Sequence, residues 1–172
     1  GGEACNENVV KKWGTNNLTF YNSYGPTETT VTATIGQINI GDQINVGKPL
    51  ANYSVAIVNE NFEIVNCGVI GEVVIAGIGL SEGYFNNNEL TKKSFIPKPK
   101  SLDMLYGDKL YLSGDLGLIN QDGNILIQGR KDNQVKIRGY RIELGEIESV
   151  INSSDHIINA IVVKEQMVGI DQ

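Results

Sequence analysis

The stretch Gly129-Arg-Lys-Asp-Asn-Gln-Val-Lys-Ile-Arg-Gly-Tyr-Arg-Ile-Glu143 decides the organisation of this chain. Before it, short β-branched and glycine-rich runs dominate, whereas residues 131–134 are charged and polar. A polar interruption between two patterned segments is typical of a domain boundary. We therefore expect a first unit at residues 1–130 and the beginning of a second, smaller unit at residues 131–172.

The pattern after this boundary predicts a small α+β unit. A pair of short strands is expected first, and a last strand is expected at residues 157–163. Between them, residues 143–151 form an amphipathic helical pattern, because Leu144, Ile147 and Ile151 fall on one face at i, i+3 and i+7.

The pattern before the boundary is mostly that of β-strands, with one short helix expected at residues 88–95. Asp122-Gly123 favours a tight hairpin with a type I′ turn. The expected strands occupy residues 53–58, 62–65, 72–76, 110–112, 116–120 and 124–127. Together with the second unit, this predicts a β-rich α+β fold that contains a distorted β-barrel or a bent sheet.

The first residues are expected to form a helix at 8–13 and a strand at 18–21 that leads into a Gly25-Pro26 turn. The segment after the turn has two interpretations. Pro26 suits the first position of a helix, whereas residues 31–35 are β-branched enough for a strand.

Composition excludes several classes of protein. The chain has 172 residues, of which 41% are hydrophobic and 20% charged, which is an ordinary globular balance. Its net charge of -6 argues against a non-specific nucleic-acid binder, because such a protein needs a basic surface. A local nucleotide pocket is compatible with that charge.

Neither a membrane nor a metal cluster is indicated. No apolar run approaches the roughly 20 residues that span a bilayer, and no signal peptide pattern is present, so we expect no membrane partner and a cytoplasmic location. Cys5, Cys67 and the single His156 are too few for a disulfide framework or a structural metal site.

Four glycine-anchored blocks carry the candidate chemistry. They are Tyr24-Gly-Pro-Thr-Glu28, the run from Gly71 to Tyr84, Ser113-Gly-Asp115, and residues 129–143. Glycine lets the backbone approach a phosphate or a ribose, and the adjacent polar groups supply a hydroxyl, carboxylates and a guanidinium. Each short block alone is as well explained by a turn, so the order of all four carries the argument.

In that order, the blocks resemble the core motifs of the amino-acid adenylation domains of nonribosomal peptide synthetases, within the adenylate-forming superfamily. The resemblance implies the end of a large adenylate-forming subdomain followed by the start of a small C-terminal one. It also implies a reaction: ATP and a carboxylate form an acyl-adenylate and pyrophosphate. The acyl group then passes to the phosphopantetheine thiol of a peptidyl carrier protein, beside adjacent synthetase domains.

The Tyr24–Glu28 block matches the family motif in full. By resemblance, Tyr24 packs on the adenine of ATP or AMP, with Gly25 beside it and the Asn22 amide near the adenine edge. Thr27 approaches the phosphate, and Glu28 helps to hold Mg²⁺. A hard cation prefers carboxylate oxygen, which agrees with this assignment.

The later blocks imply further roles. Asp115 accepts the ribose hydroxyls, and Arg130 contacts the ribose and phosphate. Asp132 is the hinge on which the small subdomain rotates, and Lys136 and the Gly139 loop, beside the channel for the carrier thiol, reach the site after that rotation. Lys136 is a candidate catalytic residue with Thr27 and Glu28.

The run from Gly71 to Tyr84 carries Glu82 where the family usually has Arg, and we assign this run to scaffolding. Ser23, Val31 and Thr32 fall at family positions that line the amino-acid pocket. They are small and mildly polar, so they do not indicate a fixed charge partner for the substrate.

The family also has a Gly/Ser/Thr-rich phosphate loop and a lysine that fall outside residues 1–172. Losing one such preorganised charge typically costs on the order of 10² to 10³ in rate. We therefore expect no amino-acid-dependent exchange between ATP and pyrophosphate from these 172 residues alone; robust exchange would contradict this expectation.

Two alternatives stay open at this point. An acyl-CoA synthetase shares the superfamily, but Leu144 stands where such ligases usually carry proline. A degenerate module that serves only as a docking surface is the other alternative. The polar residues Glu28, Asp115, Arg130 and Lys136 argue against it, because a scaffold does not need all four.

Overall fold

The computed structural model describes residues 1–14, 18–132, 134–137, 140–154 and 156–165. The chain divides into two compact units, Gly1–Lys131 and Asp132–Gln172. Among the described residues, the first unit contains two sheets and the second contains one strand pair, and we describe each unit by itself.

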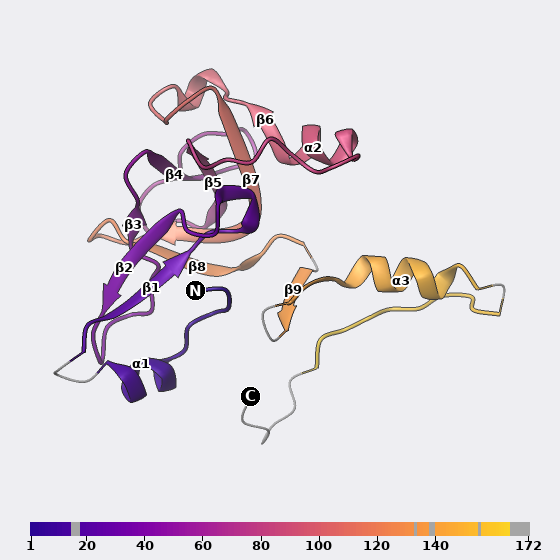
Figure 1. The fold of residues 1–172 in the computed structure, drawn as a ribbon, viewed down its shortest axis with the longest axis horizontal. Helices are drawn as coiled ribbons and strands as arrows, with labels where there is room; N and C mark the ends of the chain where they lie inside the picture. The colour runs from indigo at the N-terminus through magenta and orange to yellow at the C-terminus, as the bar shows by residue number, and fades with distance from the viewer. Residues whose placement is uncertain (15–17, 133, 138–139, 155, 166–172) are drawn as a thin grey trace. The chain divides into compact units, whose positions relative to one another are not determined.

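The first unit is organised around an antiparallel sheet in the order β4-β5-β7-β6, with β8 also paired to β7 (Figure 1). The pairing with β5 shifts register between Glu72 and Val74, and the pairing with β8 shifts between Leu116 and Gly117. Such irregularities bend a sheet. The strands are β4 (Tyr53–Val58), β5 (Gly71–Gly77), β6 (Phe95–Pro97), β7 (Lys109–Ile119) and β8 (Ile125–Arg130).

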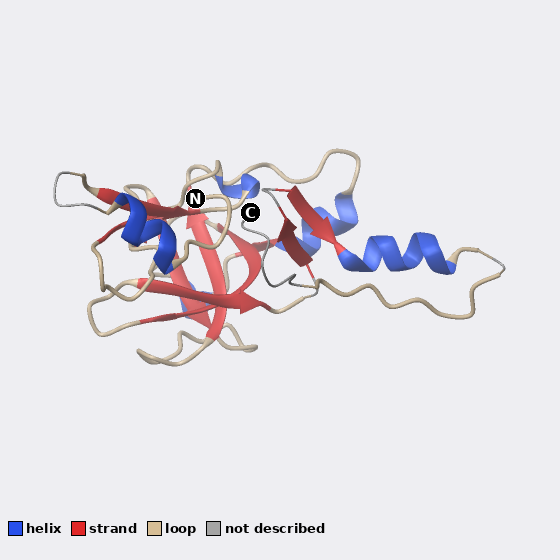
Figure 2. Cartoon of the chain, turned by 90° about the horizontal axis from the view of Figure 1, so that it is seen from below, coloured by secondary structure: helices blue, strands red, loops and turns tan. Residues whose placement is uncertain are grey.

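The central strand β5 is buried on both faces. Val73 and Ile75 belong to one hydrophobic cluster, while Val74 and Ala76 belong to a second. All four have no exposed surface, which explains why this strand reads as a continuous apolar run rather than an alternating one. The β-rich fold with a bent sheet, rather than a barrel, is thus confirmed for the described strands (Figure 2).

A smaller antiparallel sheet, in the order β1-β2-β3, precedes this one in the chain. It consists of β1 (Phe20–Tyr24), β2 (Thr34–Ile38) and β3 (Lys48–Pro49), and the helix α1 (Glu7–Trp13) comes before it with Asn6 as its N-cap. Both interpretations of the segment after Pro26 are partly right. A single 3-10 turn, η1 (Thr27–Thr29), comes first, and the strand begins at Thr34.

Three local expectations in the first unit need correction. Residues 62–65 form only an isolated bridge between Val58 and Ile64, because the Asn59 side chain accepts two backbone N–H groups and turns the chain there. The expected strands at 110–112 and 116–120 are not separate, because both runs, up to Ile119, belong to the single strand β7. Gly114 makes this possible, since it lies inside the strand at φ 69°.

The hairpin between β7 and β8 forms as expected, but its turn type differs. A type I′ turn needs positive φ at both central residues, whereas only Gly123, at φ 78°, has it in Asp122-Gly123. The Gly123 N–H donates to the Asn120 carbonyl at 3.0 Å, and the Asn120 N–H donates to the Asn124 carbonyl at 2.9 Å. This is a longer loop that ends in a left-handed glycine. The expected helix near residue 88 is α2 (Asn88–Ser94), and a second 3-10 turn, η2 (Lys100–Leu102), follows β6.

The second unit contains an antiparallel strand pair, β9 (Gln134–Ile137) and β10 (Tyr140–Glu143), and the helix α3 (Leu144–Asn152). The prediction of a strand at residues 157–163 is wrong, because the structure assigns none of these residues to a strand. Side chains of α3 instead accept hydrogen bonds from backbone N–H groups of this segment. Asn152 accepts from the Ala160 N–H at 2.7 Å, and Glu148 accepts from the Val162 N–H at 2.9 Å.

Candidate functional site

Asp115 and Arg130 face each other across the β7–β8 ladder, so the register of two strands brings them together. Arg130 Nη1 donates to Asp115 Oδ1 at 2.9 Å and to the Ser113 carbonyl at 3.0 Å. The side chains of Arg130 and Asp115 are 17% and 14% exposed, so solvent and salt screen this ion pair less than a pair in open solvent.

Tyr24, at the end of β1, reaches the same carboxylate from a different sheet. Its hydroxyl donates to Asp115 Oδ2 at 2.5 Å. Burial, and then the neighbouring Asp115 carboxylate, hold the pKa of Tyr24 well above its ordinary value, so the hydroxyl stays a donor at neutral pH. Each carboxylate oxygen has two lone pairs, so Asp115 retains the capacity to accept from a diol.

Ser113 fixes the backbone that carries Asp115. Its hydroxyl is buried, donates to the Val73 carbonyl at 2.7 Å and accepts from the Asp115 N–H at 3.0 Å. The Ser-Gly-Asp block is thereby tied to the central strand β5. Ser113, the first residue of the block, thereby supports the position of Asp115, the third.

Glu28 lies in η1 and is only 5% exposed. Its Oε1 accepts from the Tyr84 hydroxyl at 2.6 Å, and its backbone carbonyl accepts from the Ser81 N–H at 2.8 Å. Burial first, and then the hydrogen bond to Glu28, raise the pKa of the Tyr84 hydroxyl. The second carboxylate of the site is thus held by a neutral donor.

The rest of the Tyr24–Glu28 block places a hydroxyl near solvent. Thr27 is exposed at the start of η1. Gly25 sits where a side chain has no room, since a Cβ there would lie 2.6 Å from the Ala33 nitrogen and 2.8 Å from the Val31 carbonyl oxygen. Only glycine allows the chain to fold back so closely.

Asn22 lies two residues before Tyr24 in β1, on the same face of the strand. It is buried, and its side-chain nitrogen donates to the Asn45 carbonyl at 2.7 Å. In this structure the amide nitrogen therefore points to an interior backbone group, and its role near an adenine stays a prediction.

The three expected pocket residues flank the same turn. Ser23 is half-buried on the opposite face of β1, where a Cβ on Gly1 would come within 2.5 Å of its hydroxyl. Val31 is 68% exposed and has φ 67°, a left-handed conformation that a β-branched residue rarely adopts. Thr32 is half-buried, and its N–H donates to the Thr30 carbonyl at 2.8 Å.

The remaining predicted site residues belong to the second unit. Asp132 is exposed, and its Oδ1 accepts from the Gln134 N–H at 3.1 Å. The backbone of Lys136 lies in β9, while its side chain lies outside the described part of the structure, as does the whole of Gly139.

Sequence reasoning missed Tyr84, because it assigned the whole run from Gly71 to Tyr84 to scaffolding. The signal in the sequence was the Gly83-Tyr84 pair at the end of the run, where an aromatic residue follows a glycine. In the structure this glycine has φ 144°. Glu82, the departure from the family pattern, is fully exposed and pairs with Lys109 at 3.8 Å. Such a surface pair contributes little.

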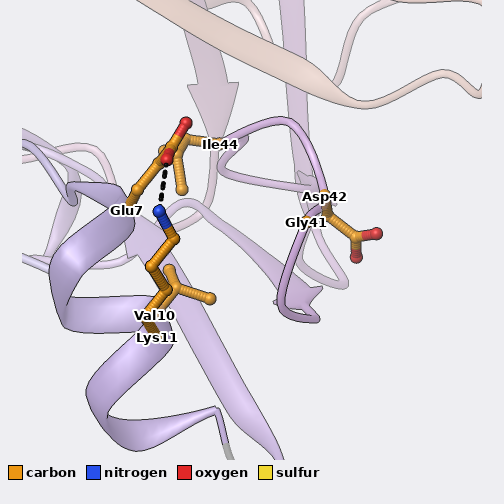
Figure 3. A pocket seen from close by; sticks show the side chains of 6 residues that line it. All are labelled: Glu7, Val10, Lys11, Gly41, Asp42 and Ile44. Atoms are coloured by element: carbon orange, nitrogen blue, oxygen red, sulfur yellow. Dashed lines mark hydrogen bonds and ion pairs between the residues drawn. The ribbon is translucent and has the colours of Figure 1, made fainter.

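A separate surface hollow lies between α1 and the loop at Gly41–Ile44 (Figure 3). Glu7 and Lys11 form an ion pair of 3.1 Å on its helical side. It shares no residue with the predicted site. The described residues contain no helix of the length and apolar character that crossing a membrane requires.

Comparison with known proteins places this geometry in a family. A family model described as AMP-binding enzyme matches residues 1–85. Bacitracin synthase 3 of Bacillus licheniformis is 45% identical over 162 residues, which are 94% of this chain and 2% of that protein. The four-domain nonribosomal peptide synthetase bound to AMP and glycine is 39% identical, with a TM-score of 0.70 over 98% of this chain and 13% of that one.

This chain is similar to AMP-binding enzymes over residues 1–85. A further solved structure, an NRPS protein containing adenylation and PCP domains, has a TM-score of 0.83 and 28% identity over 96% of this chain and 34% of that one. The resemblance to adenylation domains of nonribosomal peptide synthetases is thus confirmed. The chain spans about a third or less of each of these relatives, so the activity of a whole protein of this kind is a proposal for this chain.

Proposed function

We propose that this protein takes part in the ATP-dependent activation of an amino acid. In the first step, an oxygen of the amino-acid carboxylate attacks the α-phosphorus of ATP, and pyrophosphate leaves with the electrons of the broken bond. In the second, the phosphopantetheine thiol of a carrier protein attacks the acyl carbon, loses its proton, and AMP leaves. Adjacent synthetase domains would use the resulting thioester.

The convergence of Tyr24, Asp115 and Arg130 carries this proposal. They come from β1, β7 and β8, and they meet within 2.5 to 2.9 Å at one carboxylate. An aromatic ring, a carboxylate and a guanidinium are the groups that a nucleoside monophosphate needs for its base, its diol and its phosphate. In our proposal, Asp115 accepts the ribose hydroxyls and Arg130 offsets phosphate charge.

Mg²⁺ fits this site only together with the substrate. The described residues include no group of three or more His, Cys, Asp or Glu that could hold a metal ion. Mg²⁺ is commonly bound through one or two carboxylates, substrate phosphates and water, so a single Glu28 agrees with a cation that arrives with ATP. When bound, the ion would supply positive charge at the phosphates. Thr27, exposed beside Glu28, would donate to a phosphate oxygen.

The second unit carries the remaining roles that we propose. Asp132 would act as the hinge between the two steps, while Lys136 and Gly139 would approach the site for transfer to the thiol. Ser23, Val31 and Thr32 would line the side-chain pocket. None of the three carries a charge, which favours an uncharged substrate side chain.

The test is amino-acid-dependent exchange of radiolabelled pyrophosphate into ATP, measured on the protein encoded by the complete reading frame around these residues. We expect exchange with one or a few of the amino acids and none with fatty or aryl acids. Exchange with fatty or aryl acids alone would instead support an acyl-CoA synthetase-like ligase.

A binding measurement gives the matched control. Titration with AMP should saturate the unaltered protein, and Asp115→Ala should weaken binding by roughly tenfold or more, from the loss of charge-assisted hydrogen bonds. Absence of both exchange and nucleotide binding in the unaltered protein would contradict the proposal and support a docking module.

A further inference from the structure

The loop at residues 78–84 is attached directly to the turn that carries Glu28. The Ser81 N–H donates to the Glu28 carbonyl at 2.8 Å, and the Thr30 hydroxyl donates to the Gly79 carbonyl at 2.7 Å. The Tyr84 hydroxyl donates to Glu28 Oε1 at 2.6 Å. The first hydrogen bond fixes the backbone of the turn, the second ties the side chain of Thr30 to the loop, and the third fixes the carboxylate itself.

Tyr84 is in turn held from two sides. Its backbone N–H donates to the Thr91 hydroxyl of α2 at 2.9 Å, and its ring packs edge-on against Phe95 with centroids 5.8 Å apart. Gly83 permits this approach, since a Cβ there would lie 2.3 Å from Thr91 Cγ2. The hydroxyl is therefore aimed at Glu28 by packing and not by its own hydrogen bond alone.

The chemistry of the donor distinguishes this carboxylate from Asp115. A phenol hydroxyl orients a carboxylate without adding positive charge, whereas the Arg130 guanidinium partly cancels the charge of Asp115. The hydrogen bond from Tyr84 therefore does not reduce the attraction of the Glu28 carboxylate for a cation. The residue that sequence analysis placed in the scaffold has the position and the chemistry for this task.

We propose that Tyr84 is a positioning residue, which holds the Glu28 carboxylate in the orientation that binds the divalent cation delivered with ATP. This inference rests on the proposed function. It extends the site to the loop at residues 78–84, which we had expected to serve only as framework.

The test uses the protein from the complete reading frame and its Tyr84→Phe variant, which keeps the ring and removes the hydroxyl. Mn²⁺ serves as the probe for the cation, and its binding in the presence of ATP is followed by electron paramagnetic resonance. We expect the variant to bind Mn²⁺ roughly tenfold more weakly, the scale of one lost hydrogen bond to a charged group. The Mg²⁺ concentration that half-saturates exchange should rise by a similar factor.

Two controls separate positioning from general structural support. Metal-free binding of AMP should stay within about twofold, because it does not involve the cation. Tyr106→Phe removes a hydroxyl from a tyrosine that is 45% exposed and outside the site, and it should change none of these quantities. An equal loss of AMP and Mn²⁺ binding in Tyr84→Phe would overturn the proposal.

A double variant tests whether Tyr84 acts through Glu28. In a Glu28→Gln background, Tyr84→Phe should cause no further loss of Mn²⁺ binding, because the carboxylate that it positions is gone. Additive losses would overturn the inference. Unaltered protein that neither exchanges nor binds Mn²⁺ with ATP would overturn the proposed function as well, whereas an active protein with an indistinguishable Tyr84→Phe variant would overturn this inference alone.

Discussion

The two carboxylates of the site are held in opposite ways. Asp115 sits on regular strands, where the β7–β8 ladder places Arg130 opposite it and a buried serine fixes its backbone. Glu28 sits on a single 3-10 turn followed by two residues with left-handed φ, and its supports come from a loop more than fifty residues away. The first carboxylate is set by strand register and the second by contacts between loops.

The largest expected effect comes from a change at Asp115, the carboxylate that is held by strands. Asp115→Ala removes the carboxylate that pairs at 2.9 Å with the Arg130 guanidinium, which is 17% exposed. Removing one partner of a largely buried pair should lower the free energy of unfolding by about 3 kcal/mol. Urea denaturation measures this loss.

Lys11→Ala is the matched control for that measurement. Lys11 pairs with Glu7 at 3.1 Å, but the two side chains are 61% and 73% exposed, so we expect a change below about 1 kcal/mol. Equal losses in the two variants would contradict the distinction between a sheltered and a surface ion pair.

Ser113→Ala tests the support beneath Asp115. The change leaves the Val73 carbonyl and the Asp115 N–H without the hydroxyl that serves both, so we expect a loss of about 2 kcal/mol in unfolding free energy. Ser101→Ala removes a hydroxyl that donates to the Phe62 carbonyl at an exposed position, and it should cost less than about 1 kcal/mol. If Ser113→Ala lowers the free energy of unfolding no more than Ser101→Ala does, the position of Asp115 does not depend on Ser113.

Gly79→Ala tests the loop contacts that support the turn of Glu28. A Cβ at Gly79 would lie 1.7 Å from the hydroxyl of Tyr53, whose hydrogen bond to the Thr29 carbonyl supports the turn. Such overpacking should lower the melting temperature, with a cost of about 1 to 2 kcal/mol. Gly145→Ala in α3 meets no atom within 4 Å and should leave stability unchanged or raise it by about 0.5 kcal/mol.

The smallest effect concerns Tyr24, which links the two sheets through its hydroxyl. Because its pKa is raised, the folded protein keeps the phenol proton at a pH where the unfolded chain releases it. This contribution to stability is complete below about pH 10 and is lost as the pH rises toward the folded value. Absorbance of phenolate in the ultraviolet should show that Tyr24 and Tyr84 both release their protons above the ordinary pKa of a tyrosine, and Tyr24→Phe should remove the Tyr24 part of this late transition.

The sequence predicted those elements whose signal is local. The apolar run of β5, the short helices α1 and α2, and the Asp122-Gly123 hairpin are all predicted by patterns within a few residues of the structure they specify. It failed at residues 62–65 and 157–163, because β-like composition does not say whether a partner strand is present. The same limit applies to the site.

The order of the blocks predicts that Asp115, Arg130 and Glu28 belong to one site, and the structure pairs Asp115 with Arg130. The order could not show what holds them, since the Tyr24–Asp115 contact joins residues 91 apart and the Tyr84–Glu28 contact joins residues 56 apart. Such contacts follow from the register of a whole sheet and the path of its loops. They leave no mark in a short stretch of sequence.

Strand β7 has a consequence for the order of folding. It pairs with β6 near one end, with β8 near the other, and with β5 along its length, and it carries both Ser113 and Asp115. The pairing with β5 joins residues far apart along the chain, such as Gly71 and Gly117, and such a pairing forms late, because a long loop must close first. A chain in which β7 is still unpaired has no place for a nucleotide, so the appearance of binding during refolding would mark the moment when the central sheet is complete.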